Sequence, residues 1–204
     1  MNTRMLACSL GLLAMTGAPV TMAGLANGDF GSGFAGWSGE TEDTISDLIS
    51  VAPGGPYFTL LGEGLAELAT DPTGVNTYAV ELFQVFDLPG NATTLDFDWS
   101  WTLTNVSTDP FDLAQAILTN TANTLDSLLL LDATTLTGSG TSSVDISGFA
   151  GKNVELRFRV GDGGDDQSDS FSFGNIVVNQ APAPSTIALL GLGALGLRRA
   201  RRQR

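Results

Sequence analysis

The sequence predicts an all-β protein whose central part folds as an antiparallel β-sandwich of the jelly-roll type. Two stretches, Leu95–Thr104 (LDFDWSWTLT) and Asn153–Val160 (NVELRFRV), alternate apolar and polar residues, as strands with one buried face do. Several shorter β-rich runs follow one another at a spacing of roughly ten residues. No long stretch has the helical period of about 3.6 residues. Together these patterns favour a sandwich or jelly roll.

The first 23 residues have the layout of a secretory signal peptide. Met1–Arg4 is short and basic, Met5–Met15 is apolar, and Thr21-Met22-Ala23 places small residues before the expected cleavage point. We therefore expect cleavage after Ala23 and export of the remaining chain. A lipoprotein signal ending at Cys8 is disfavoured, because almost no apolar run precedes this cysteine.

The first half of the central domain, residues 24–179, contains one helical candidate and three strand candidates. Asp43–Val51 is compatible with a short helix, and Tyr57–Leu61 is a short β-rich run. Thr77–Leu88 is rich in valine and phenylalanine, which strands favour, and the alternating stretch Leu95–Thr104 follows it. Turns are expected at Asp71-Pro72-Thr73-Gly74 and Leu88-Pro89-Gly90-Asn91.

The second half begins with an ambiguous segment and ends with two strands. Asp112–Asn120 (DLAQAILTN) fits either a helix or a strand, because its larger apolar residues also share one helical face. Leu125–Leu131 and Ser143–Ile146 are short strand candidates, and Thr137–Gly140 between them predicts a turn. The last two strands are expected at Asn153–Val160 and Phe171–Val178.

The central domain is strongly acidic. It contains all 22 acidic residues but only three basic ones, Lys152, Arg157 and Arg159, which leaves a net charge of −19. Such a surface repels the phosphates of DNA and RNA, so nucleic-acid binding is excluded. It suits an exported domain that attracts cations.

The chain contains no histidine, and its one cysteine, Cys8, lies in the signal peptide. The exported part therefore has no disulfide, no thiol nucleophile, no imidazole base and no His- or Cys-ligated metal. Carboxylates remain for catalysis, and hard cations with oxygen ligands remain as metals. Asp96 and Asp98 point the same way from one strand, but a glycosidase normally takes its acid and base from different strands. We expect them to be solvated or paired with Arg157 and Arg159, and the protein not to be an enzyme.

The densest group of candidate metal ligands lies in the loop GDGGDDQSD. Four carboxylates within eight residues of a Gly-rich loop can surround a calcium ion, although the spacing is not that of an EF-hand. The alternative is a solvated acidic turn. Calcium is the one cofactor candidate, and its ligands would be Asp162, Asp165, Asp166 and Asp169.

The C-terminal segment, residues 180–204, combines a proline-rich tripeptide, an apolar run at Ile187–Leu197 and a cluster of arginines. This arrangement resembles the PEP-CTERM protein-sorting signal, with Ala183 in the place of the glutamate. The resemblance implies processing by an exosortase-type membrane enzyme in a Gram-negative bacterium that makes exopolysaccharide. The processing motif would be Pro182, Ala183, Pro184 and Ser185, and the cluster is Arg198, Arg199, Arg201, Arg202 and Arg204.

The length of the apolar run bears on how the segment meets the membrane. As a short helix, eleven residues span roughly 16 Å, about half of a hydrocarbon core of ~30 Å. The arginines would stay on the cytoplasmic side and set the topology. These features favour a transient anchor in the inner membrane. The alternative is an amphipathic or disordered basic tail.

The central domain also resembles galactose-binding-like jelly rolls, a fold shared by many carbohydrate-binding modules. The matching segments are Asn27-Gly28-Asp29-Phe30 with Gly36-Trp37, Leu95-Asp96-Phe97-Asp98-Trp99, and Gly151–Phe158 followed by the acidic loop. Such jelly rolls often hold a structural calcium, but its usual acidic ligands correspond here to Gly31 and Gly174. That site is therefore not carried over.

Sugar-binding modules stack exposed aromatic rings on their ligands. Here Trp37, Trp99, Trp101 and Phe158 are expected in the core, which leaves Tyr57 and Tyr78 as candidates.

These features predict an exported, non-catalytic protein of the cell surface or extracellular matrix. Its C-terminal signal would sort it, with transient membrane anchoring, and it would associate with exopolysaccharide in a biofilm. The alternative is a carbohydrate-binding module at the cell surface.

Overall fold

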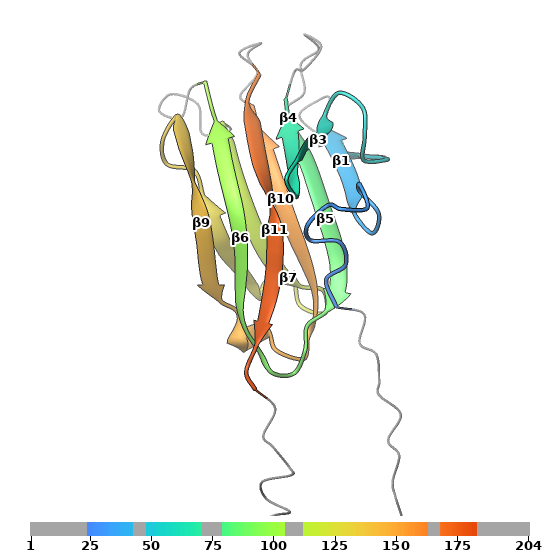
Figure 1. The fold of residues 1–204 in the computed structure, drawn as a ribbon, viewed down its shortest axis with the longest axis vertical. Coiled ribbons are helices and arrows are strands. Elements are labelled where there is room, and N and C mark those ends of the chain that lie inside the picture. The colour runs from blue at the N-terminus through green and yellow to red at the C-terminus, as the bar shows by residue number, and fades with distance from the viewer. Residues whose placement is uncertain (1–23, 43–47, 71–78, 105–111, 163–167, 183–204) are drawn as a thin grey trace, which may run out of the picture.

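The structure, a computed structural model, describes residues 24–42, 48–70, 79–104, 112–162 and 168–182. Within them two antiparallel sheets pack face to face (Figure 1). The six-stranded sheet contains, in spatial order, β2 (Leu48–Val51), β1 (Ser38–Glu42), β5 (Ala79–Asp87), β10 (Asn153–Gly161), β7 (Leu113–Asn120) and β8 (Ser127–Asp132). The five-stranded sheet contains β3 (Phe58–Gly62), β4 (Leu65–Ala69), β11 (Ser170–Gln180), β6 (Ala92–Thr102) and β9 (Thr137–Asp145). The predicted all-β sandwich is confirmed.

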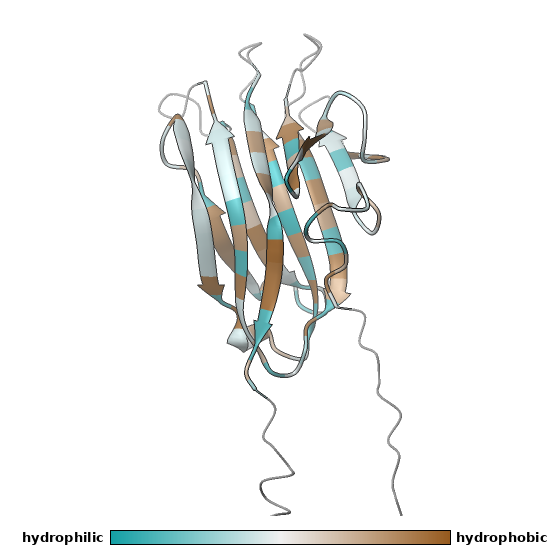
Figure 2. Cartoon of the chain, viewed as in Figure 1, coloured by the Kyte–Doolittle hydropathy of each residue, from teal (hydrophilic) through white to brown (hydrophobic). Residues whose placement is uncertain are grey.

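The core lies between the two sheets and is dominated by aromatic side chains. Along β10, the residues Val154, Leu156, Phe158 and Val160 are buried and alternate with polar ones. Phe158 stacks on Phe173 of β11 in the facing sheet, with ring centroids 3.8 Å apart. Figure 2 shows the resulting alternation of hydrophobic and hydrophilic bands along the strands.

The two strictly alternating stretches form the long strands β6 and β10, as predicted. The β-rich runs at 77–88 and 171–178 contain β5 and most of β11, with residues 77–78 outside the described part. The weaker candidates at 57–61 and 125–131 correspond to β3 and β8. The turn expected at Leu88-Pro89-Gly90-Asn91 connects β5 to β6. The turn expected at residues 71–74 lies outside the described residues.

Both segments with helical character contain strands instead. Residues 48–51 form β2, paired with β1, while residues 43–47 of the expected helix lie outside the described part. Most of Asp112–Asn120 forms β7, Leu113–Asn120, whose buried residues Ala114, Ala116 and Leu118 recur with period two. Two of these three buried residues are alanines, which contribute little to a hydrophobic pattern. The larger leucine and isoleucine side chains dominate the pattern and suggest a helical face instead.

The turn expected at Thr137–Gly140 is wrong, since these residues begin β9. Their glycines lie under the tryptophans of β6: a Cβ at Gly138 would lie 2.7 Å from Cζ2 of Trp101.

Trp101 and Phe158 are buried as expected, but Trp99 is only half-buried. It stacks on Trp101 with ring centroids 4.3 Å apart near the edge of the sheet, where β9 offers only small residues to cover it.

Outside the strands, the described residues contain one 3-10 turn, Ser147–Phe149, and no α-helix. None of their elements is a helix long and apolar enough to cross a lipid bilayer. The expected signal peptide and the expected apolar C-terminal helix lie outside the described residues.

Candidate metal centre

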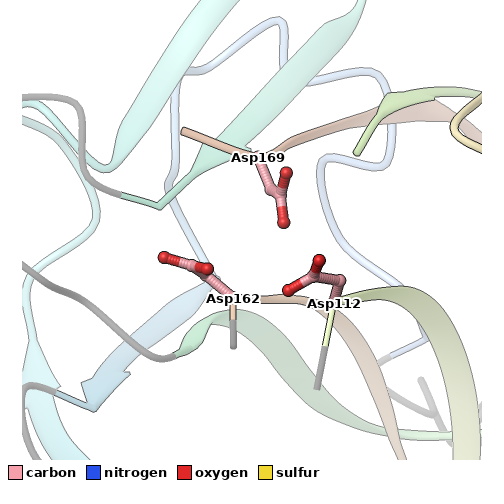
Figure 3. Close-up of side chains that lie close together, drawn as sticks. All are labelled: Asp112, Asp162 and Asp169. Carbon is pink, nitrogen blue, oxygen red and sulfur yellow. The ribbon is translucent and has the colours of Figure 1, made fainter. Parts of the chain in front are cut away.

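Three aspartates from separate parts of the chain meet at one end of the sandwich (Figure 3). Asp112 directly precedes β7, Asp162 directly follows β10, and Asp169 directly precedes β11. One carboxylate oxygen from each lies within 4.8 Å of the other two, and all three residues are buried. The fold therefore concentrates three acidic groups in a space that water hardly reaches.

The strand pairing explains why these three residues meet. β7 and β10 are antiparallel neighbours, and their last pair is Gly161 opposite Leu113. One step further in the same register places Asp162 beside Asp112 at the end of the six-stranded sheet. Asp169 enters from the facing sheet, because the next residue, Ser170, already pairs with β4 and β6.

Hydrogen bonds hold Asp169 in place. Its backbone N–H donates to Oγ1 of Thr70 over 2.9 Å, and its carbonyl accepts from the N–H of Thr70 over 3.0 Å. Its carboxylate oxygen Oδ1 accepts from the N–H and the hydroxyl of Thr104, over 2.7 and 2.9 Å. The other oxygen, Oδ2, is buried and has no hydrogen-bond donor among the described residues.

Burial raises the pKa of Asp169 to about 6. The two hydrogen bonds from Thr104 act against this shift, whereas the negative charges of Asp112 and Asp162 add to it. Near neutral pH the centre thus holds a negative charge that the protein does not fully stabilise by itself. A hard cation with oxygen ligands is the kind of partner that such a group accommodates.

The structure joins two of the four aspartates predicted from the acidic loop, Asp162 and Asp169, and adds Asp112. Asp165 and Asp166 lie outside the described residues. The sequence gives no sign of Asp112, because it stands far from the acidic loop and heads a segment of ambiguous type. Only the pairing of β7 with β10 reveals it.

Asp96 and Asp98 lie on the outer face of the five-stranded sheet, away from this centre. Asp96 accepts hydrogen bonds from Ser143 and Asn179, and Asp98 accepts them from Thr141 and Asn175. These hydrogen bonds lower the pKa of both carboxyls. The bond from Ser143 has the largest effect on Asp96, and the bond from Thr141 has the largest effect on Asp98.

The expected pairing of these aspartates with arginines is wrong, because the arginines belong to the other sheet. There Arg157 pairs with Glu40, Glu81 and Glu155, and Arg159 pairs with Glu81.

Comparison with known proteins identifies the C-terminal segment. Residues 180–203 match the PEP-CTERM protein-sorting motif, which includes Pro182–Ser185 and all but the last of the five arginines. The chain is thus a β-sandwich protein that carries a PEP-CTERM sorting motif. This motif indicates export, transient membrane anchoring and processing by an exosortase, a membrane enzyme. No curated protein sequence matches the chain.

Solved structures are similar to the described domain at low sequence identity. The carbohydrate-binding module TmCBM61, in complex with beta-1,4-galactotriose, has 13% identity and a TM-score of 0.44 over 78% of this chain and 99% of its own. The K3 cleaved adhesin domain of Lys-gingipain from Porphyromonas gingivalis has 14% identity and a TM-score of 0.47, covering 75% and 97%.

A domain of tailspike protein 4 from bacteriophage CBA120 has 11% identity and a TM-score of 0.44. The match covers 78% of this chain but only 22% of the tailspike chain.

Proposed function

We propose that the chain is an exported, non-catalytic protein of the cell surface or extracellular matrix that associates with exopolysaccharide. The observation that carries this proposal is the sorting motif at residues 180–203. The signal-peptide layout of residues 1–23 supports it, because a C-terminal sorting signal needs a chain that has entered the export route. The acidic central domain supports it as well, since high net charge keeps a released protein soluble.

The chemistry of the exposed carboxylates supports a non-catalytic role. A glycosidase uses a pair of carboxyl groups, one of them with a raised pKa so that it can donate a proton. In Asp96 and Asp98 hydrogen bonds lower both pKa values, so the two groups stay ionised and do not divide the roles of acid and base.

A carbohydrate-binding module at the cell surface is the alternative. Such a module needs an exposed aromatic ring on a sheet face. The aromatic side chains that the structure describes are buried or half-buried, and Phe83 on the outer face of the six-stranded sheet lies 4.5 Å below the guanidinium of Arg157. We therefore place this role second, and binding of residues 24–179 to one defined oligosaccharide on a glycan array would reverse the order.

The C-terminus of the mature protein tests the proposal most directly. We expect mass spectrometry of the surface or secreted form to find a chain that ends near residues 182–185, without the arginine cluster. Matrix material from the same culture should retain the processed protein and release it when exopolysaccharide is digested. A mature form that still ends at Arg204 would contradict processing.

The arginines allow a matched pair of variants. Replacing all five by glutamine removes the positive charges that resist translocation, so uncut protein with an intact apolar run should appear outside the cell. Replacing all five by lysine keeps the charge and should leave topology and processing as in the parent. Equal behaviour of the two variants would contradict the topological role of the cluster.

A further inference from the structure

We propose that Asp112, Asp162 and Asp169 bind one calcium ion, which joins the two sheets at this end of the sandwich. This inference does not depend on the sorting motif. Figure 3 shows the three carboxylates converging on a common space, with those of Asp112 and Asp162 on one side and that of Asp169 on the other.

The environment of Asp169 gives independent support for a ligand. The side chain is fully buried, yet its Oδ2 atom has no hydrogen-bond donor among the described residues, whereas Oδ1 has two. A buried, ionised oxygen without a partner is strongly unfavourable unless a counter-charge reaches it. In Figure 3 one oxygen of Asp169 is directed between the other two carboxylates, where a cation would supply that charge.

The spacing of the oxygens fits calcium. Oxygens bind this ion at about 2.3–2.6 Å, so two ligands on opposite sides are separated by at most roughly 5 Å. The three oxygens here lie within 4.8 Å of one another, so one ion can reach all of them without rearrangement of the backbone. Three carboxylates provide between three and six of the about six to eight oxygens that calcium takes. The absence of histidine from the chain favours calcium over zinc or copper.

This centre differs from the calcium site that the jelly-roll resemblance suggests. That site would use the positions of Gly31 and Gly174. A Cβ at Gly174 would overlap the carbonyl oxygen of Gly64, so the structure has no room for a side chain there. Asp169 stands at the start of β11, five residues before Gly174, and its partners come from β7 and β10.

An ion in this position would act across the sandwich. Asp112 and Asp162 adjoin the ends of strands in the six-stranded sheet, whereas Asp169 leads into the five-stranded one. The ion would therefore connect the sheets directly and remove the repulsion between the three carboxylates. We expect an affinity in the range of extracellular calcium modules, about 10⁻⁴–10⁻³ M, because the site has few protein ligands.

The experiment is a calcium titration of the purified full-length chain in buffered 150 mM sodium chloride after removal of divalent ions. We expect calorimetry to find one calcium ion per chain, and calcium at 5 mM to raise the melting temperature, because the ion binds only the native state. Asp112→Asn should weaken binding at least tenfold and remove the rise. Asp132→Asn removes an exposed charge outside the centre and is the matched control. This variant should keep the calcium affinity and the calcium-induced rise in melting temperature.

The melting temperature of each variant is also measured without calcium, which shows whether the substitution itself changes the stability of the fold. Replacing a repelling buried carboxylate by an amide should leave this temperature equal to or above that of the parent, so a folded variant without a calcium response supports the site. Two results would overturn the proposal: no heat of binding in the parent, or a calcium-induced rise that Asp112→Asn and Asp169→Asn both retain. The second result would mean that calcium only screens the overall negative charge of the protein, −13 for the full-length chain.

Discussion

Asp169 is a residue whose two carboxylate oxygens have different surroundings, and its titration should be visible in the stability of the protein. Without calcium, the folded protein holds the proton of Asp169 more tightly than the unfolded chain, with a pKa of about 6 against the ordinary 3.8. This contribution to stability is complete below about pH 4 and is lost as the pH rises through about 6. The loss is at most about 3 kcal/mol.

Urea unfolding between pH 4 and pH 7 in calcium-free buffer measures this loss, and Asp169→Asn should lose less stability over the same range. The lowered pKa values of Asp96 and Asp98 act in the opposite direction and at lower pH, because their contribution disappears as the pH falls through the folded values. Parallel profiles for the parent and Asp169→Asn would contradict the raised pKa.

Gly138 is a second residue whose role can be tested alone. Its missing side chain makes room for Trp101, whose indole N–H donates to the carbonyl of Thr135 over 2.9 Å and so resists displacement. Gly138→Ala should therefore destabilise the protein by about 1–3 kcal/mol, as overpacking of a core does. Gly148→Ala meets no atom within 4 Å and serves as the control in the same urea unfolding experiment. Equal stability of the two variants would show that the tryptophan can move freely.

At the scale of elements, β1 shows what pattern reading misses. Its sequence, SGETE, has no apolar residue, although Gly39 and Thr41 face the core. A Cβ at Gly39 would lie 2.8 Å from the ring of Phe58, so the strand contributes close backbone packing. On the outer face Glu40 pairs with Arg157 of β10 over 3.0 Å. Such a strand depends on tertiary partners, which no local periodicity reports.

The end of β11 offers a further test, because it precedes the sorting motif. Two hydrogen bonds join Asn91 to Ala181. The carbonyl of Asn91 accepts from the N–H of Ala181 over 2.8 Å, and its side-chain amide donates to the carbonyl of Ala181 over 2.6 Å. Asn91→Ala removes the second bond, and we expect hydrogen exchange at the amide of Ala181 to become about threefold to tenfold faster.

Asn123→Ala, in an exposed turn, should leave this exchange rate unchanged. No acceleration in Asn91→Ala would mean that the backbone bond alone holds the end of the domain.

For the whole molecule, the sequence is sufficient to predict the sandwich but not its complete site. The alternation in β6 and β10 predicts long strands with one buried face, because side-chain period and burial are directly linked. The acidic loop predicts Asp162 and Asp169 as metal ligands, because they lie close together in the sequence. Asp112 joins them through strand register, which is a long-range property, and the same is true of the glycines under Trp99 and Trp101.

The direction of β11 separates the acidic centre from the sorting motif. This strand begins beside the acidic centre and ends where the chain leaves for the sorting motif, so the two lie at opposite poles (Figure 1). Eleven residues of strand separate them by roughly 35 Å. That distance is several times the Debye length, which is about 8 Å at physiological ionic strength. Screening by salt therefore leaves the acidic centre nearly independent of charges at the far end of β11, where the chain continues into the sorting motif.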